Sequence, residues 1–262
     1  MADGTTPGPL LTGALRFLDT QLALFTNAIA HGPSTSKSST VIILTAKHGQ
    51  SPMKPSALVR ISDGAIMSAL NAAWNLVDAT QPSLVALTAD DDGMQIWLND
   101  RSPEALHFAK EFIMSHSGTG TSLTNPAVPY TQSGLVAAYS GSEACNFYGV
   151  ICPDVRVPDI VGIAAYGVVY TGGVKKISEH GGFNSEDRHV PLVISGKCLP
   201  PANAGVSVSS NVFTVQVAPT LLTLLGLDPF RLAAVQIEGT EVLPLSYTVT
   251  SKGDEHKNLR AI

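Results

Sequence analysis

A helix, a polar loop and an apolar strand follow one another near the start of the chain, and this order restricts the fold most. Apolar side chains recur every three or four residues from Leu10 to Ile29, which predicts an amphipathic helix lying against an apolar surface. Residues 41–46 (VIILTA) are apolar on both faces and rich in β-branched side chains, as is typical of a buried strand in a parallel sheet. This order indicates a layered α/β fold.

Composition and charge exclude several classes of protein. Hydrophobic residues make up 44% of the 262 residues and charged residues 14%, which excludes a disordered acidic chain and a coiled coil. The net charge of −5 gives no electrostatic basis for binding a nucleic-acid polymer. The length suits one large domain, or one domain with a substantial insertion.

The middle of the chain has a different order of elements. Between residues 56 and 153 the pattern predicts a strand, a helix, two strands and a second helix, which starts at Ser102 followed by a proline and a carboxylate. Short apolar strands return from Asp159 onward, and a compact helix follows over residues 219–226. We therefore expect a core over residues 1–55 and 154–245, a small α+β insertion over 56–153, and a polar tail over 246–262.

The three cysteines and the chain's start say little about location. Cys145, Cys152 and Cys198 are an odd number without metal-type spacing, so neither a disulfide framework nor a zinc knuckle is predicted. A pair such as Cys145 with Cys152 closes a short loop if the protein meets an oxidising compartment. We predict no secretory signal and no membrane span, because the start lacks a basic region before an apolar one and the longest uncharged stretch is broken by prolines. The localisation stays open.

The first candidate site segment is residues 45–52 (TAKHGQSP). His48 comes just after the predicted strand, and ligands gather at the carboxyl ends of strands in open parallel sheets. An imidazole there suits a metal ligand or an acid/base group, while a purely structural histidine accounts for the position equally well.

The second candidate segment is residues 179–191 (EHGGFNSEDRHVP). Its two glycines allow close approach of the backbone to a bound ion, and its side chains include donors suited to zinc. Those donors are Glu179, His180, Asp187 and His189. The alternative is a solvated loop whose charges pair with one another, which is the favoured interpretation for His189.

These segments together resemble one enzyme family. TAKHGQSP resembles the strand-end motif of the type I phosphodiesterase/nucleotide pyrophosphatase family of the alkaline phosphatase superfamily, whose usual form ends in Ser/Thr-Asp-His-Gly. KISEHGGFNSEDRHVPLVIS resembles the later His-Gly segment of these enzymes, and VAPTLLTLLGLDP resembles their Ala-Pro-Thr helix. The helix from Leu10 to Ile29 is similar to the one before their Asp-His strand, so the resemblance covers essentially the whole chain.

The resemblance implies a fold and an activity. The family has a three-layer α/β/α sandwich with a paired metal site, commonly zinc, and hydrolyses phosphodiesters or nucleotide pyrophosphates. Carried over by residue, His48 matches a ligand of one metal and His180 a ligand of the other. The donors of the second segment add Asp187 as a candidate for an additional ligand. The implied substrate is a small phosphoester.

The chain departs from the family's pattern at two points. The Asp of Asp-His is here Lys47, whose ammonium cannot ligate a dication but suits contact with phosphate. A microbial and fungal branch of the family has Ala-Lys-His-Gly at this place. The alternative is a site that has lost metal binding. The family's Ser/Thr nucleophile lies before the Leu10 helix, so the chain corresponds to the later half of the enzyme and no catalytic nucleophile is predicted in it. The alternative function is an inactive truncated fragment, or a subunit whose exposed sheet edge needs a partner chain or an oligomer.

Two further features of the sequence are candidate sites. Asp90, Asp91 and Asp92 form a carboxylate run between two predicted strands, for which a solvated turn is favoured over a calcium or zinc site. Neither Ser51 nor Ser195 lies in a Gly-x-Ser-x-Gly elbow, so a serine hydrolase has little support.

Overall fold

The computed structural model describes residues 6–32, 40–80, 83–197, 199 and 201–245; the predicted polar tail and Cys198 lie outside them. The chain divides into two compact units, which are described one at a time. Unit 1 comprises residues 1–14 and 47–190, and unit 2 comprises residues 15–46 and 191–262. The mixture of helices and several small sheets is of the predicted α/β class.

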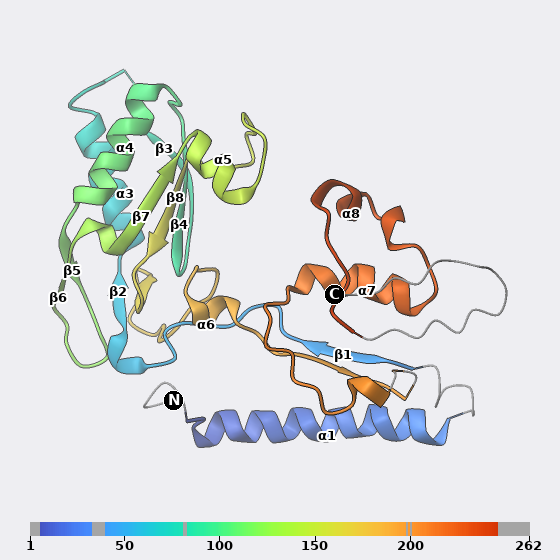
Figure 1. The fold of residues 1–262 in the computed structure, drawn as a ribbon. Helices are drawn as coiled ribbons and strands as arrows, with labels where there is room; N and C mark the ends of the chain where they lie inside the picture. The colour runs from blue at the N-terminus through green and yellow to red at the C-terminus, as the bar shows by residue number, and fades with distance from the viewer. Residues whose placement is uncertain (1–5, 33–39, 81–82, 198, 200, 246–262) are drawn as a thin grey trace. The chain divides into compact units, whose positions relative to one another are not determined.

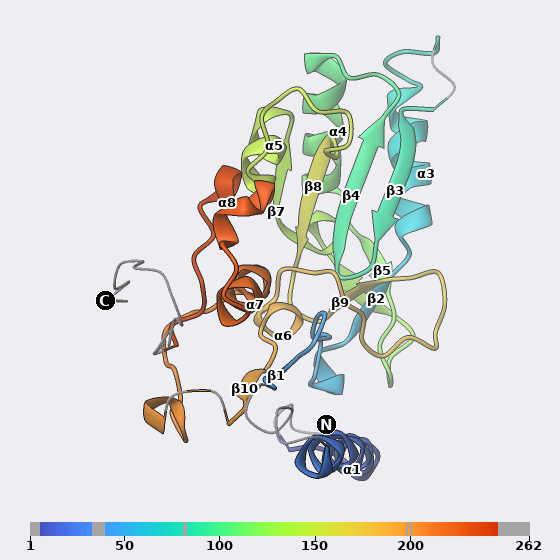
Figure 2. The ribbon, with the colours of Figure 1, turned by 90° about the vertical axis from the view of Figure 1, so that its right-hand side faces the viewer.

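Unit 1 is built on a four-stranded antiparallel sheet (Figure 1). In sheet order its strands are β3 (Val85–Asp90), β4 (Gly93–Leu98), β8 (Ile160–Ala164) and β7 (Leu135–Ser140). Figure 2 shows the four strands side by side in this order. Helices α3 (Asp63–Trp74) and α4 (Pro103–Ser115) lie on one face of the sheet, as expected for an α+β unit.

The core of unit 1 lies between these helices and the sheet. The helices contribute Ile66, Leu70, Trp74, Ala105, Ala109 and Ile113, and the sheet contributes Met94, Ile96, Leu135 and Ile160. Each large aliphatic side chain buried there stabilises the fold by about 1.5–3 kcal/mol. The predicted cap of α4 is confirmed, because the hydroxyl of Ser102 accepts a hydrogen bond from the amide of Ala105 at 3.2 Å.

Smaller elements surround this sheet in unit 1. Strand β2 (Val59–Ile61) pairs in parallel with β9 (Val168–Tyr170), and β5 (Gly118–Gly120) pairs antiparallel with β6 (Val128–Tyr130). The remaining helices are η1 (Pro55–Ala57), η2 (Gln132–Gly134), α5 (Ser142–Tyr148) and α6 (Ser185–Arg188). A disulfide joins Cys145 of α5 to Cys152, the pairing that the sequence analysis left open.

Unit 2 contains a two-stranded sheet and several helices. Strand β1 (Ile42–Thr45) pairs with β10 (Leu192–Ser195). The helices are α1 (Pro9–His31, from residue 15 onward), η3 (Pro201–Asn203), η4 (Thr214–Gln216), α7 (Val217–Leu224), η5 (Pro229–Arg231) and α8 (Ala233–Glu238). Buried Thr220 anchors α7, because its hydroxyl donates to the carbonyl of Gln216 and accepts from the amide of Leu243.

Two expectations about this unit need correction. The prediction of a buried parallel strand over residues 41–46 is wrong, since β1 runs antiparallel to β10 and Leu44 is 41% exposed. The predicted α1 helix is present, but none of its described residues is buried, and Leu15, Leu18 and Phe25 of its apolar stripe are exposed. A pattern of apolar residues indicates a tendency to be buried, but it does not identify the surface that would bury them.

The two units also divide the chain differently from the expected domains. The expected insertion over residues 56–153 shares unit 1 with residues 154–190, which had been assigned to the core. The reason is β8, which pairs with β4 on one side and β7 on the other and so completes the insertion's sheet.

The helices of the described residues include none with the length and apolar character that a membrane span requires.

Candidate metal site

The two histidines singled out in the sequence lie together in unit 1. The rings of His48 and His180 stack with their centroids 3.9 Å apart and their planes 23° apart. His48 Nδ1 lies 2.7 Å from the carbonyl oxygen of Gly49. Because a carbonyl only accepts, Nδ1 carries the proton, and in the neutral ring Nε2 keeps its lone pair, which is the usual arrangement of a metal-binding histidine.

Backbone hydrogen bonds hold the two candidate segments side by side. Ser51 and Glu179 exchange two of them, with N···O distances of 2.9 and 2.8 Å. The amide of Gly49 donates to the carbonyl of Asp187 at 2.7 Å, within the same segment that carries His180. The stack of the two rings therefore rests on paired backbone and not on the side chains alone.

Two glycines make this close approach possible. A Cβ atom at Gly49 would overlap the carbonyl oxygen of Glu186, and one at Gly182 would lie 2.6 Å from Asp92 Cβ and 2.7 Å from Asp187 Oδ2. Gly181 and Gly182 are predicted to admit a bound ion, whereas Gly182 admits the neighbouring chain, as Gly49 does.

A three-residue cluster of metal-binding side chains includes His180. One ligand atom from each of Asp91, Glu179 and His180 lies within 4.8 Å of the other two, and all three residues are partly buried. An imidazole with two carboxylates is a donor set found in catalytic zinc sites, which keep a further position open. His48 stacks on this cluster but is not one of its three members.

Lys176 supplies the positive charge of this cluster. Its Nζ lies 3.0 Å from Asp91 Oδ1 and 2.5 Å from Glu179 Oε2. The hydrogen bond to Glu179 raises the pKa of Lys176, so the ammonium is charged at neutral pH. The space between the two carboxylates is therefore a place that holds a cation.

A buried pair of carboxyl groups lies beside the cluster. Asp92 is 0% exposed and Asp187 4%, and the Ser51 hydroxyl lies 3.1 Å from Asp92 Oδ2 and 3.0 Å from Asp187 Oδ2. Burial, with the nearby charge of Asp187 as the second cause, raises the pKa of Asp92 to about 8, and burial raises the pKa of Asp187 too. The pair therefore holds a proton at neutral pH.

The predicted site residues have separate places in this arrangement. His48 and His180 come together, whereas Asp187 forms the buried pair with Asp92 and is not a member of the three-residue cluster. Lys47 is exposed, and its contact with phosphate stays a prediction. A solvated turn is the wrong interpretation for Asp92, which is fully buried, whereas the side chain of Asp91 is 43% exposed in a bend and belongs to the cluster.

The sequence analysis missed Asp91 and Lys176 as members of the site. A run of three aspartates directly before an apolar strand was a usable signal, since a strand fixes the direction in which neighbouring side chains point. The signal for Lys176 was weaker, because only its position three residues before Glu179 suggests the pairing.

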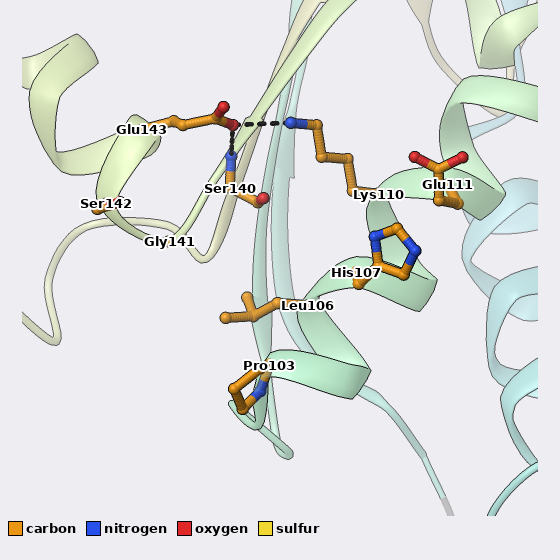
Figure 3. Close-up of a pocket in the computed structure, with 9 residues that line it drawn as sticks. All are labelled: Pro103, Leu106, His107, Lys110, Glu111, Ser140, Gly141, Ser142 and Glu143. Atoms are coloured by element: carbon orange, nitrogen blue, oxygen red, sulfur yellow. Dashed lines mark hydrogen bonds and ion pairs between the residues drawn. The ribbon is translucent and has the colours of Figure 1, made fainter.

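A separate cavity of about 420 Å³ lies between α4 and α5 (Figure 3). Its charged residues Lys110 and Glu143 pair with each other at 2.7 Å, and Glu143 also accepts from the amide of Ser140. The residues of the two candidate segments do not line it. The Lys110–Glu143 pair links α4 to α5 across it, and the side chains of His107 and Glu111 also line it.

Comparisons of the chain with protein-family models and with curated proteins found no match.

Proposed function

We propose that this chain carries the metal-binding part of a phosphoester hydrolase, acting on phosphodiesters or nucleotide pyrophosphates. The observation that carries the proposal is the stack of His48 on His180, which unites the two motifs of the family resemblance beside a cluster of two carboxylates. The three-layer α/β/α sandwich of that family belongs to the same proposal. It is supported by the order of the motifs along the chain.

The residues of the site fit a divalent ion such as zinc. Asp91, Glu179 and His180 would hold it. His48, whose Nε2 keeps its lone pair, would be a ligand of the second metal that the family resemblance implies. A divalent ion in this position supplies Lewis-acid polarisation of a phosphoryl oxygen and lowers the pKa of bound water. The chain's own residues set the charge and the orientation of that ion's ligands.

We do not propose Ser51 as the nucleophile. Its side chain is buried, 1% exposed, and its hydroxyl lies between Asp92 and Asp187. The exposed Lys47 immediately precedes His48 in the chain. We propose that its ammonium contacts the negatively charged phosphate of the substrate.

The test measures metal binding and hydrolysis on the same preparations. Chelator-treated protein is titrated with Zn²⁺ by calorimetry, and hydrolysis of bis(p-nitrophenyl) phosphate is followed with and without the metal. The variant His180→Ala removes a cluster member, and His189→Ala is the matched control because His189 is exposed and outside the cluster. We expect zinc binding that His180→Ala abolishes and His189→Ala leaves unchanged. Zinc-dependent hydrolysis is expected to be weak, because no nucleophile is predicted in the chain, and to follow the same pattern in the two variants.

Two results decide against this function. Wild-type protein that binds no zinc would overturn the metal site itself. Zinc binding without any hydrolysis would favour the second candidate, a subunit that completes its site with a partner chain.

The second candidate function is favoured by helix α1. Leu10, Phe17, Leu18 and Phe25 of this helix are each more than half exposed, at 93%, 63%, 56% and 66%. Exposed apolar surface of this extent on a 23-residue helix is typical of a face that another surface covers. We propose a partner chain or a second copy as that surface, and sedimentation showing only monomers across a range of concentrations would count against it.

A further inference from the structure

The ammonium of Lys176 lies between two of the three side chains that would hold the metal. Its Nζ contacts Asp91 Oδ1 at 3.0 Å and Glu179 Oε2 at 2.5 Å, while His180 Nε2 lies 3.8 Å from Glu179 Oε1. Both carboxylates of the cluster thus share one lysine.

We propose that Lys176 is a resident cation that competes with the metal ion for Asp91 and Glu179, so that metal uptake is an exchange of one cation for another. This inference rests on the proposed metal site and adds its regulation. The metal-free site is held together by the lysine, and metal binding requires the ammonium to leave.

Electrostatics requires the exchange. An ammonium and a divalent ion that share the same two carboxylates would lie within a few ångströms of each other, where like charges repel strongly. Lys176 contacts one oxygen of each carboxylate, and these are the same two carboxylates that the metal would use. The lysine and the metal are therefore alternative occupants.

The chain allows the lysine to move without disturbing its backbone. The guanidinium of Arg60, which is 5% exposed, donates from Nε to the carbonyl oxygen of Lys176 and from Nη1 to that of Ser122. The Lys176 side chain is 41% exposed, so its ammonium has a path to water. A fixed backbone with a solvent-accessible side chain suits a cation that is displaced and returns.

The test compares Lys176→Gln with Lys175→Gln in chelator-treated full-length protein. Lys175 is the matched control because it is the exposed neighbour and carries the same charge. Zinc affinity is measured by calorimetry and the melting temperature is measured with and without zinc. We expect Lys176→Gln to bind zinc about tenfold more tightly than wild type, a modest gain because the ion pair is partly exposed, and Lys175→Gln to change affinity little.

Melting temperatures provide a readout independent of activity. Without metal, Lys176→Gln leaves Asp91 and Glu179 without their shared counter-ion, so its melting temperature falls below that of wild type. With zinc, its melting temperature rises by more than that of wild type, because no lysine is displaced. Lys176→Arg keeps a cation in place and serves if the glutamine variant fails to fold; its zinc affinity is expected at or below the wild-type value.

The outcomes separate this inference from the proposed function. Wild-type zinc binding with equal or weaker binding by Lys176→Gln would overturn the competition and leave the metal site standing. Tighter binding by Lys176→Arg would overturn it too. Absence of zinc binding in wild type and in every variant would overturn both.

Discussion

The imidazoles of His48 and His180 stack with their centroids 3.9 Å apart, and His180 Nε2 lies 3.8 Å from the carboxylate oxygen Oε1 of Glu179. His48 instead uses Nδ1 on the carbonyl of Gly49, at 2.7 Å. The two rings therefore differ in what fixes them, since one is oriented by backbone and the other lies among charges. That difference predicts different effects of substitution.

His48→Phe separates packing from metal ligation. Phenylalanine keeps a ring for the stack but has no nitrogen, so we expect zinc affinity to fall by about tenfold or more, as it would for His48→Ala. The measurement is zinc calorimetry on both variants. Wild-type affinity in His48→Phe, with a loss in His48→Ala, would show that His48 only supports the ring of His180.

Gly182 is required by sterics. An alanine there would place its Cβ 2.6 Å from Asp92 Cβ and 2.7 Å from Asp187 Oδ2, two side chains that are buried and unable to yield freely. We expect Gly182→Ala to lower the free energy of unfolding by about 1–3 kcal/mol, the usual cost of overpacking.

Urea unfolding of Gly182→Ala beside Gly172→Ala checks this expectation. Gly172 has open space around its Cα, so its alanine variant is expected within about 0.5 kcal/mol of wild type. Equal midpoints for the two variants would contradict the steric argument.

Local elements of the fold were predictable because their signals are local. The amphipathic period from Leu10 to Ile29 gave α1 to within two residues at each end, and the Ser102 cap marked the start of α4. Strand pairing was not predictable in the same way. The apolar residues of β8 fit a core strand of any sheet, and only the three-dimensional structure assigns it to β4 and β7.

The site was predictable in part for the same reason. His48 is followed by Gly49, and His180 by Gly181 and Gly182, so each lies in a short local motif and both were identified from the sequence. The position of each of the three consecutive aspartates depends on a turn, which places Asp91 in the cluster and Asp92 in the interior. Composition does not carry that information, and charge runs are more often solvated.

The cap of α4 provides a test of stability away from the site. The Ser102 hydroxyl accepts from the amide of Ala105, so Ser102→Ala is expected to lower the free energy of unfolding by about 1 kcal/mol. Ser142→Ala is the control, because α5 has Gly141 at its N-cap and no side-chain cap bond. Denaturant midpoints of the two variants that coincide would contradict the role of the cap.

The pair of Asp92 and Asp187 predicts how stability depends on pH. Burial raises the pKa of Asp92 from 3.8 to about 8, so in metal-free protein the folded state keeps a proton that the unfolded state releases. The stabilisation from this proton is fully present below the unfolded pKa and is lost as the pH rises through the folded pKa. We therefore expect the free energy of unfolding to fall from pH 4 towards pH 8 with a slope of up to about 1.4 kcal/mol per pH unit.

Asp92→Asn identifies the group responsible. The amide replaces a protonated carboxyl by a neutral group of the same shape, so the variant should lose most of the slope and exceed wild type in stability at alkaline pH. Urea unfolding at several pH values in the presence of chelator measures both quantities. An unfolding free energy that does not fall as the pH rises, or an equal slope in the variant, would mean that the two carboxyls share no proton. The buried charge of Asp92 would then need another compensating partner.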